Sequence, residues 1–266
     1  MKIYIPSLSR PTKQITWNEL RGVKGLRKGD VSVVINRGEV NDYVKGNPDI
    51  VLITPPSSVR GIGKVRQWLL EYHAKNNNDQ RMVMMDDDLT FSTRRTDDPT
   101  KATPATKNDI MQMLKCMDGM LKYKWHGSIV AREGANRFAD DAVLDNTRLL
   151  RVLGYRAADV LSLGVRFSRL PVMEDFDVTL QLLRAGKENF ALCEWWQNQA
   201  GSGLDGGCST YRDREMQATG AHGLKKLHPD FVTVVEKTTK GAWGGGTRTD
   251  VRIAWKKAFA SSGVKK

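Results

Sequence analysis

The stretch Met82-Val83-Met84-Met85-Asp86-Asp87-Asp88 joins an apolar run directly to three consecutive aspartates. A short, uninterrupted apolar run is typical of a strand that is buried on both faces of a sheet. The aspartates should therefore lie at the carboxyl end of that strand, where open α/β sheets bind ligands. Three adjacent carboxylates repel one another unless a cation lies among them, and oxygen ligands of this kind suit Mg²⁺ or Mn²⁺. A solvated acidic turn is the alternative interpretation.

The residues before this stretch predict an α/β fold. Apolar residues recur at helical spacing over residues 64–75, which predicts an amphipathic helix between the last two of four strands. Strand, helix, strand is a βαβ unit, and such crossovers give parallel pairing in a sheet that is covered on both faces. The three strands expected before the aspartate-bearing strand span residues 2–6, 31–35 and 49–54.

The second half of the chain continues the pattern. Residues 96–106 are polar and contain proline, so a surface loop is expected there, followed by a helix with an apolar stripe over residues 110–121. Further strands are expected at residues 126–130, where Gly127 indicates a close backbone approach, and at 189–193. Because no repeat or Gly/Ser linker divides the chain, we expect one domain over residues 1–266, built on a mostly parallel central sheet.

Composition limits the function classes. The formal net charge of the protein is +12, and the basic residues are spread along the chain. A basic surface favours a polyanionic partner, and a nucleic acid is favoured over a membrane surface. Three well-separated cysteines argue against a disulfide framework and a zinc site, and favour a reducing compartment. No signal-peptide core or membrane span is visible, so we expect a soluble, cytoplasmic protein without a membrane partner.

A second acidic cluster, Glu174-Asp175, opens a predicted helix that closes at Ala185-Gly186. Acidic residues in a first turn favour the helix dipole, so a purely structural role competes here. The functional interpretation is a general base, a carboxylate held near an acceptor hydroxyl and separate from those that hold metal.

The order of these features resembles a glycosyltransferase of the A-type (Rossmann-like) fold, and four runs resemble the TET-associated glycosyltransferase family, found largely in bacteriophages. That family is linked to sugar addition on hydroxymethylated pyrimidines in phage DNA. The resemblance implies a nucleotide-sugar-dependent hexosyltransferase with a UDP-sugar donor, Mn²⁺ or Mg²⁺, and modified duplex DNA as acceptor, in the cytoplasm of an infected bacterium. Residues 1–90 would form the nucleotide-sugar half and 91–266 the acceptor half. The runs are Ser9-Arg10-Pro11, Arg60 to Trp68, Met85 to Phe91 and Gly206 to Arg212.

The same resemblance implies roles for single residues. Asp86 and Asp88 would hold the metal and the donor diphosphate, with Asp87 between them pointing to the opposite side if the strand pleat continues. Asp175 would be the general base, with Glu174 as second choice. The loop after the first strand, with Ser7 and Arg10, would border the nucleotide, and Arg37 would contact its base or ribose.

Four residues at the start of the 64–75 helix have an independent physical case as donor ligands. Glycines at a helix entrance allow close approach of backbone N–H groups to an anion, and arginines add positive charge. A tight loop with solvated arginines is the alternative. The residues are Arg60, Gly61, Gly63 and Arg66.

Acceptor contacts are expected near the carboxyl end. The glycine-rich loop at residues 199–207 could cover the donor or shape the acceptor pocket. Trp195 and Trp196 are candidates for stacking, with core packing as their alternative. His222 is a candidate third metal ligand, with surface or packing roles as alternatives for it and for His228. Basic residues and tryptophans in the tail fit a nucleic-acid surface or a packed helix. The remaining acceptor candidates are Gly207, Tyr211 and Arg212.

Other functions stay open at this point. Clustered aspartates also serve metal-dependent nucleases and phosphotransferases, although no Glu-x-Lys element or Walker-type loop accompanies them. A glycosyltransferase with a protein or polysaccharide acceptor and a non-catalytic nucleic-acid-binding module are further alternatives.

Overall fold

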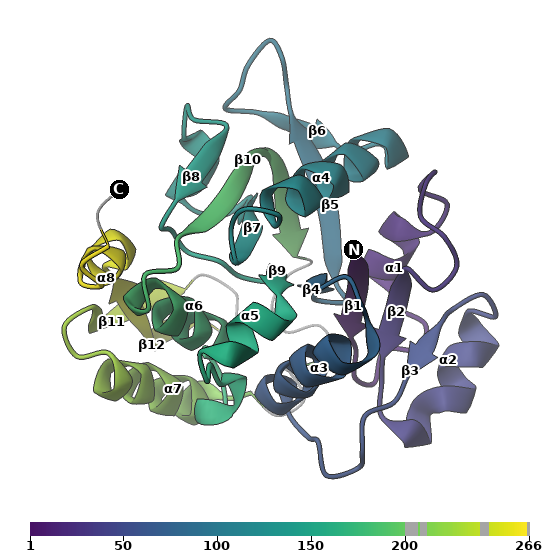
Figure 1. Cartoon of the computed structure of the whole chain (residues 1–266), viewed down its shortest axis with the longest axis horizontal. Helices are drawn as coiled ribbons and strands as arrows, with labels where there is room; N and C mark the ends of the chain where they lie inside the picture. The colour runs from purple at the N-terminus through teal and green to yellow at the C-terminus, as the bar shows by residue number, and fades with distance from the viewer. Residues whose placement is uncertain (200–206, 208–211, 240–244, 265–266) are drawn as a thin grey trace.

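The protein is described by a computed structural model that covers residues 1–199, 207, 212–239 and 245–264. Within these ranges a ten-stranded sheet has the order β3-β2-β1-β4-β9-β7-β10-β5-β6, with β8 paired to β10 (Figure 1). Helices cover both faces of this sheet, and a separate two-stranded sheet lies at one side. The expected α/β fold around a large central sheet is confirmed.

The amino-terminal third of the chain forms a block of parallel strands in the sheet. β1 pairs in parallel with β2 and with β4, and β2 pairs in parallel with β3. The apolar run before the aspartates is β4, and its last four residues are buried, as predicted. The helix between β3 and β4 is also confirmed, whereas β3 is shorter than residues 49–54. The bounds are β1 Lys2–Pro6, β2 Val31–Val34, β3 Leu52–Ile53, α3 Ile62–Asn76 and β4 Arg81–Met85.

The remaining strands add antiparallel pairs, together with one parallel pair between β7 and β10. Residues 96–106 were expected to be a loop but contain a short strand, β6, because the chain folds back to pair with β5. At Gly127 an added Cβ would lie 2.1 Å from the Phe190 ring, which confirms the predicted close approach. The bounds are β5 Leu89–Arg94, β6 Ala102–Pro104, β7 His126–Ala131, β8 Val143–Asp145, β9 Val152–Arg156 and β10 Asn189–Gln199.

Two apolar cores follow from the pleat of the strands. Ile3 and Ile5 of β1 face one core, which is closed by α1, α2 and α4, while Tyr4 faces the other, which is closed by α3, α5 and α6. A Thr106–Asp109 capping box starts α4. The bounds of these helices are α1 Ile15–Leu20, α2 Val40–Gly46, α4 Lys107–Met120, α5 Ala157–Ser162 and α6 Glu174–Arg184.

A third core joins the carboxyl-terminal elements to α6. The hairpin of β11 (Val232–Thr239) and β12 (Gly246–Ile253) packs with α7 (Arg214–Leu227) and α8 (Trp255–Ala260) beside α6 (Figure 1). For the carboxyl-terminal tail the sequence allowed either a nucleic-acid surface or a packed helix. The structure contains a helix, α8, that packs Phe259 into this core, and the segment before it is the strand β12. None of the helices in the described ranges is long and apolar enough to cross a membrane.

Candidate active site

A cavity of about 1540 Å³ lies at the carboxyl ends of β1, β2 and β4 and reaches the start of α6. This volume exceeds that of a typical single-ligand pocket, so there is room for two substrates. The cavity brings together most of the site residues predicted from the sequence, although they come from segments far apart in the chain. The predicted residues that line it are Ser7, Arg10, Arg37, Arg60, Gly61, Arg66, Asp86, Asp87, Asp88, Glu174, Asp175, Gly207 and Arg212.

Asp87 is held against the loop that follows β1. Its Oδ2 accepts a hydrogen bond from Ser7 Oγ at 2.5 Å, and its Oδ1 lies 2.5 Å from Arg10 Nη1. Burial raises the pKa of Asp87 to about 6, although the Arg10 guanidinium and the Ser7 hydroxyl oppose the shift. The aspartates lie beyond β4, which ends at Met85. Asp86 contacts Arg66 whereas Asp87 and Asp88 both contact Arg10, so the three side chains do not alternate as they would in a strand pleat.

Asp88 shares Arg10 with Asp87 but keeps one oxygen available. Its Oδ2 accepts from Arg10 Nη1 at 3.1 Å and from Gln199 Nε2 at 3.0 Å. Its Oδ1 is buried, and the described residues give it no hydrogen-bond partner. A buried carboxylate oxygen without a partner is costly, which makes this atom a candidate ligand for a cation.

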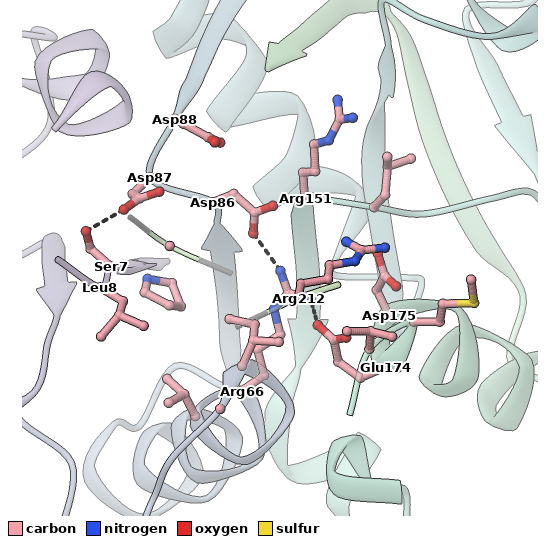
Figure 2. Close-up of a pocket in the computed structure, with 18 of the residues that line it drawn as sticks. Ser7, Leu8, Arg66, Asp86, Asp87, Asp88, Arg151, Glu174, Asp175 and Arg212 are labelled. Atoms are coloured by element: carbon pink, nitrogen blue, oxygen red, sulfur yellow. Dashed lines mark hydrogen bonds and ion pairs between the residues drawn. The ribbon is translucent and has the colours of Figure 1, made fainter. Parts of the chain in front are cut away.

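A buried arginine links the aspartates to the second acidic cluster. Arg66 Nη2 lies 2.6 Å from Asp86 Oδ1, and Arg66 Nη1 lies 2.5 Å from Glu174 Oε1 (Figure 2). Burial raises the pKa of Glu174 and of Asp86, and the Arg66 guanidinium acts against both shifts. The two carboxylates in turn raise the pKa of Arg66, so this arginine stays charged.

Asp175 is the carboxylate of the second cluster that remains accessible. It is half-buried, lines the cavity, and accepts a hydrogen bond from the N–H of Phe176 at 2.9 Å. The residue that precedes the cluster, Met173, has φ 63°, a left-handed conformation that a side chain makes costly. The backbone therefore fixes the angle at which α6 begins, and with it the direction of Asp175.

The glycines at the start of α3 have different roles. Gly61 has φ 85° and precedes the helix at the cavity wall, and nothing lies within 4 Å of the position of an added Cβ; its close approach to an anion stays a prediction. Gly63 does not line the cavity; an added Cβ there would lie 2.8 Å from the carbonyl oxygen of Phe167. The structure thus gives Gly63 a packing role.

The two tryptophans lie within β10, which continues to Gln199 instead of ending at Cys193. Pairing with β5 extends the strand, with Trp195 opposite Thr93. Trp196 is 3% exposed and donates to the carbonyl of Cys193, and neither tryptophan lines the cavity. Core packing, the alternative weighed from the sequence, describes them better than acceptor stacking.

The histidine candidates also lie away from the cavity lining. His222 is exposed on α7, and His228 is buried against Asp177, with 2.7 Å between its Nε2 and Asp177 Oδ1. Their positions lend no support to a ligand role at the aspartates. Tyr211 and most of the loop at 199–207 lie outside the described residues.

Several lining residues were not predicted as site residues from the sequence. Arg148 and Arg151 approach from the segment between β8 and β9, and their spacing in the chain gives no signal of this. Phe176 of α6 also lines the cavity and packs edge-on against Trp255 at 5.6 Å between ring centroids. Further unpredicted lining residues include five from β12 and α8: Arg248, Asp250, Val251, Ile253 and Trp255.

The aspartates fit a hard divalent cation. In the described part of the chain no three His, Cys, Asp or Glu side chains converge on one point. Two carboxylates nevertheless suffice for Mg²⁺ or Mn²⁺ when substrate phosphates and water complete the shell. Asp88, with its unpartnered oxygen, and Asp86, whose side chain is 28% exposed, are the residues suited to that role.

An α/β sheet with aspartates at its carboxyl edge and a second carboxylate on a facing helix is the architecture of A-type glycosyltransferases. The chain belongs to the TET-associated glycosyltransferase family, whose family model matches residues 1–200. No curated protein matches the chain.

Solved structures of glycosyltransferases share the fold at low sequence identity. Staphylococcus aureus TarS with UDP-GlcNAc is 14% identical, with a TM-score of 0.52 over 85% of this chain and 67% of that chain. Glucosyl-3-phosphoglycerate synthase of Mycobacterium tuberculosis with Mg²⁺ and UDP is 13% identical, with a TM-score of 0.50 over 96% and 90%. A Pyrobaculum calidifontis mannosyltransferase with GDP-Man and Mn²⁺ is 10% identical, with a TM-score of 0.52 over 85% and 62%. The chain thus spans about two thirds of the TarS chain.

Proposed function

We propose that the protein transfers a sugar from a UDP-sugar to the hydroxyl of a hydroxymethylated pyrimidine in DNA, with Mn²⁺ or Mg²⁺ bound at the aspartates. One observation carries this proposal: a single cavity contains Asp88, with an unpartnered carboxylate oxygen, and Asp175, an accessible carboxylate on a facing helix. The cavity thus provides one acidic group for donor binding, Asp88, and a separate one for proton removal, Asp175.

The donor belongs in the amino-terminal half, about residues 1–90. Arg60 and the backbone at Gly61 lie where α3 begins, and a helix start attracts a diphosphate. Asp86 and Asp88 would hold the metal, which supplies positive charge to the leaving diphosphate. The complexes of TarS with UDP-GlcNAc and of glucosyl-3-phosphoglycerate synthase with UDP support a uridine nucleotide.

Asp175 would remove the proton from the acceptor hydroxyl. Glu174 is buried and engaged with Arg66, so it is suited to fixing the start of α6 rather than to taking a proton. A base on the acceptor side favours direct displacement, in which the acceptor oxygen bonds to the anomeric carbon while the bond to the diphosphate breaks. The configuration of the sugar would then be inverted.

The acceptor belongs in the half formed by residues 91–266. Phe176 and Trp255 offer an aromatic wall next to Asp175, and Val251 and Ile253 extend its apolar surface. A planar base turned out of the duplex would fit against such a wall, because enzymes that modify a base must extract it from the stack. The net charge of +12 supports a polyanionic acceptor.

The test is to incubate the protein with a panel of sugar nucleotides, Mn²⁺ and DNA that contains hydroxymethylcytosine or hydroxymethyluracil. Mass spectrometry of the digested nucleosides should show a hexose added to the modified base. Unmodified DNA serves as the control. Hydrolysis of the sugar nucleotide without any glycosylated nucleoside would disprove DNA as acceptor and leave the donor assignment standing.

A further inference from the structure

Two arginines in the cavity carry more positive charge than their protein partners neutralise. Arg151 Nη2 lies 2.6 Å from Glu133 Oε1, but its Nη1 is buried and has no hydrogen-bond partner among the described residues. Arg148 has no carboxylate within 4.0 Å in the described ranges; its Nη2 donates to the carbonyl of Glu133 at 3.4 Å. Two guanidinium groups with open donor positions therefore share one part of the cavity.

The environment penalises the charge of Arg148. Burial and the neighbouring charge of Arg151 lower its pKa, while Asp175, Glu133 and Asp250 act in the opposite direction. A partly desolvated guanidinium gains most from a ligand that supplies a compensating negative charge and accepts two parallel hydrogen bonds. A phosphate does both.

The backbone holds both arginines in place. Arg151 has φ 60°, and its carbonyl oxygen accepts from the N–H of Asp86 at 3.0 Å, which fixes it beside the end of β4 (Figure 2). Between the two arginines, Leu149 is fully buried in the core. An added Cβ at Gly134 would lie 3.1 Å from Arg148 Nη2, so the glycine leaves room for the guanidinium.

We propose that Arg148 and Arg151 form a subsite that binds a phosphate of the acceptor and so places its hydroxyl beside Asp175. The inference rests on the proposed function and deepens it. The carboxylates that act on Arg148 belong to α6, β12 and the segment after β7, on the acceptor side, whereas Arg60 and Gly61 serve the donor at α3. In DNA, the phosphate next to the extruded nucleotide would be the group bound.

The experiment uses inorganic phosphate as the probe and the full chain saturated with UDP and Mg²⁺, so that the donor site is filled. Broadening of the ³¹P signal of phosphate measures binding in the parent, in Arg148→Gln and in Arg132→Gln. Arg132 is exposed and does not line the cavity, so its variant loses the same charge elsewhere. Arg148→Lys tests the need for the guanidinium fork.

We expect the parent and Arg132→Gln to bind phosphate equally, and Arg148→Gln to bind about tenfold more weakly, with Arg148→Lys between them. UDP affinity, measured by calorimetry, should be the same in all four proteins. If Arg132→Gln weakens phosphate binding as much as Arg148→Gln does, the loss comes from the lower net charge alone, and the subsite proposal is wrong. Two other results would also overturn the subsite: loss of phosphate binding when UDP is added, or weaker UDP binding in Arg148→Gln. Either result would mean that the arginines bind the donor diphosphate.

The phosphate readout requires no glycosyl transfer. If phosphate binds as expected but hydroxymethylated DNA is not glycosylated, the proposed acceptor fails while the phosphate subsite stands. If DNA is glycosylated but phosphate binding is the same in Arg148→Gln and the parent, the subsite fails alone.

Discussion

Arg66 and Glu174 lie 108 residues apart in the chain, yet their side chains meet at 2.5 Å in a fully buried contact. Since the same guanidinium also contacts Asp86, one residue of α3 joins the end of β4 to the start of α6. The two acidic clusters are thus bridged by one buried guanidinium.

Replacing Arg66 with methionine should reduce the free energy of unfolding by about 3 to 5 kcal/mol, because it leaves the buried Glu174 carboxylate, together with the partly exposed Asp86, without its partner. Urea denaturation measures this loss. Arg166→Met is the matched control, since Arg166 forms an exposed pair with Glu71 at 3.5 Å and should cost less than about 1 kcal/mol. Similar losses in both variants would show that the Arg66 bridge adds little.

Replacing Asp88 with asparagine should abolish sugar transfer and weaken UDP binding in the presence of Mn²⁺, because the unpartnered carboxylate oxygen loses its charge. Calorimetry with and without Mn²⁺ separates the metal-dependent part of the affinity. Asp97→Asn, at an exposed residue paired with Arg95, controls for charge. If Asp88→Asn binds UDP and Mn²⁺ like the parent, the metal assignment is wrong.

Replacing Asp175 with asparagine should lower the rate of transfer on the order of 10²- to 10⁴-fold, since the variant cannot accept the proton. Donor affinity should be unchanged. Glu174→Gln, one residue away, should mainly affect stability because it perturbs the Arg66 bridge. If Asp175→Asn transfers sugar at the parental rate while Glu174→Gln is inactive, Glu174 is the general base and Asp175 is not.

Between about pH 4 and 6.5, His126 should contribute a stability that rises with pH, opposite in sign to the contribution of Asp87, whose pKa is raised to about 6. Burial lowers the pKa of this histidine from 6.5 to about 4, so in this window the unfolded chain binds a proton that the folded chain does not. The contribution is fully present above pH 6.5 and is lost as the pH falls through 4, with a total of about 3 kcal/mol.

His126→Gln should lower the slope of the unfolding free energy against pH in that window relative to the parent, because glutamine does not titrate and the His126 contribution is removed. His222→Gln, at an exposed histidine, should keep the parental slope. The same slope in parent and His126→Gln would show that another group causes the pH dependence.

Local pattern was sufficient to locate the aspartates. An apolar run that ends in charge predicts a buried strand and its exit, and β4 ends at Met85, directly before Asp86. The helical spacing of α3 and the helix start at Glu174 were also visible in the sequence. These features depend on a few neighbouring residues, which is why periodicity reveals them.

Contacts between distant segments could not be predicted in this way. β10 continues through Trp195 because β5 pairs with it, and nothing near the tryptophans in sequence shows that partner. Arg148 reaches the cavity because the chain folds back between β8 and β9. Asp87 and Asp88 turn toward Arg10 and Asp86 turns toward Arg66, and these arginines lie 77 residues from Asp87 and 20 residues from Asp86 in the chain.

The contacts of Arg10 have a consequence for how the site meets its ligands. Since the Arg10 guanidinium lies 2.5 Å from Asp87 and 3.1 Å from Asp88, and Arg66 contacts Asp86, the protein supplies its own counterions to all three adjacent carboxylates. Their positions are set by the fold, with Ser7 and Gln199 as further partners. The acidic end of β4 is therefore preorganised: a ligand that arrives there finds the oxygens already oriented, and little reorganisation energy opposes its binding.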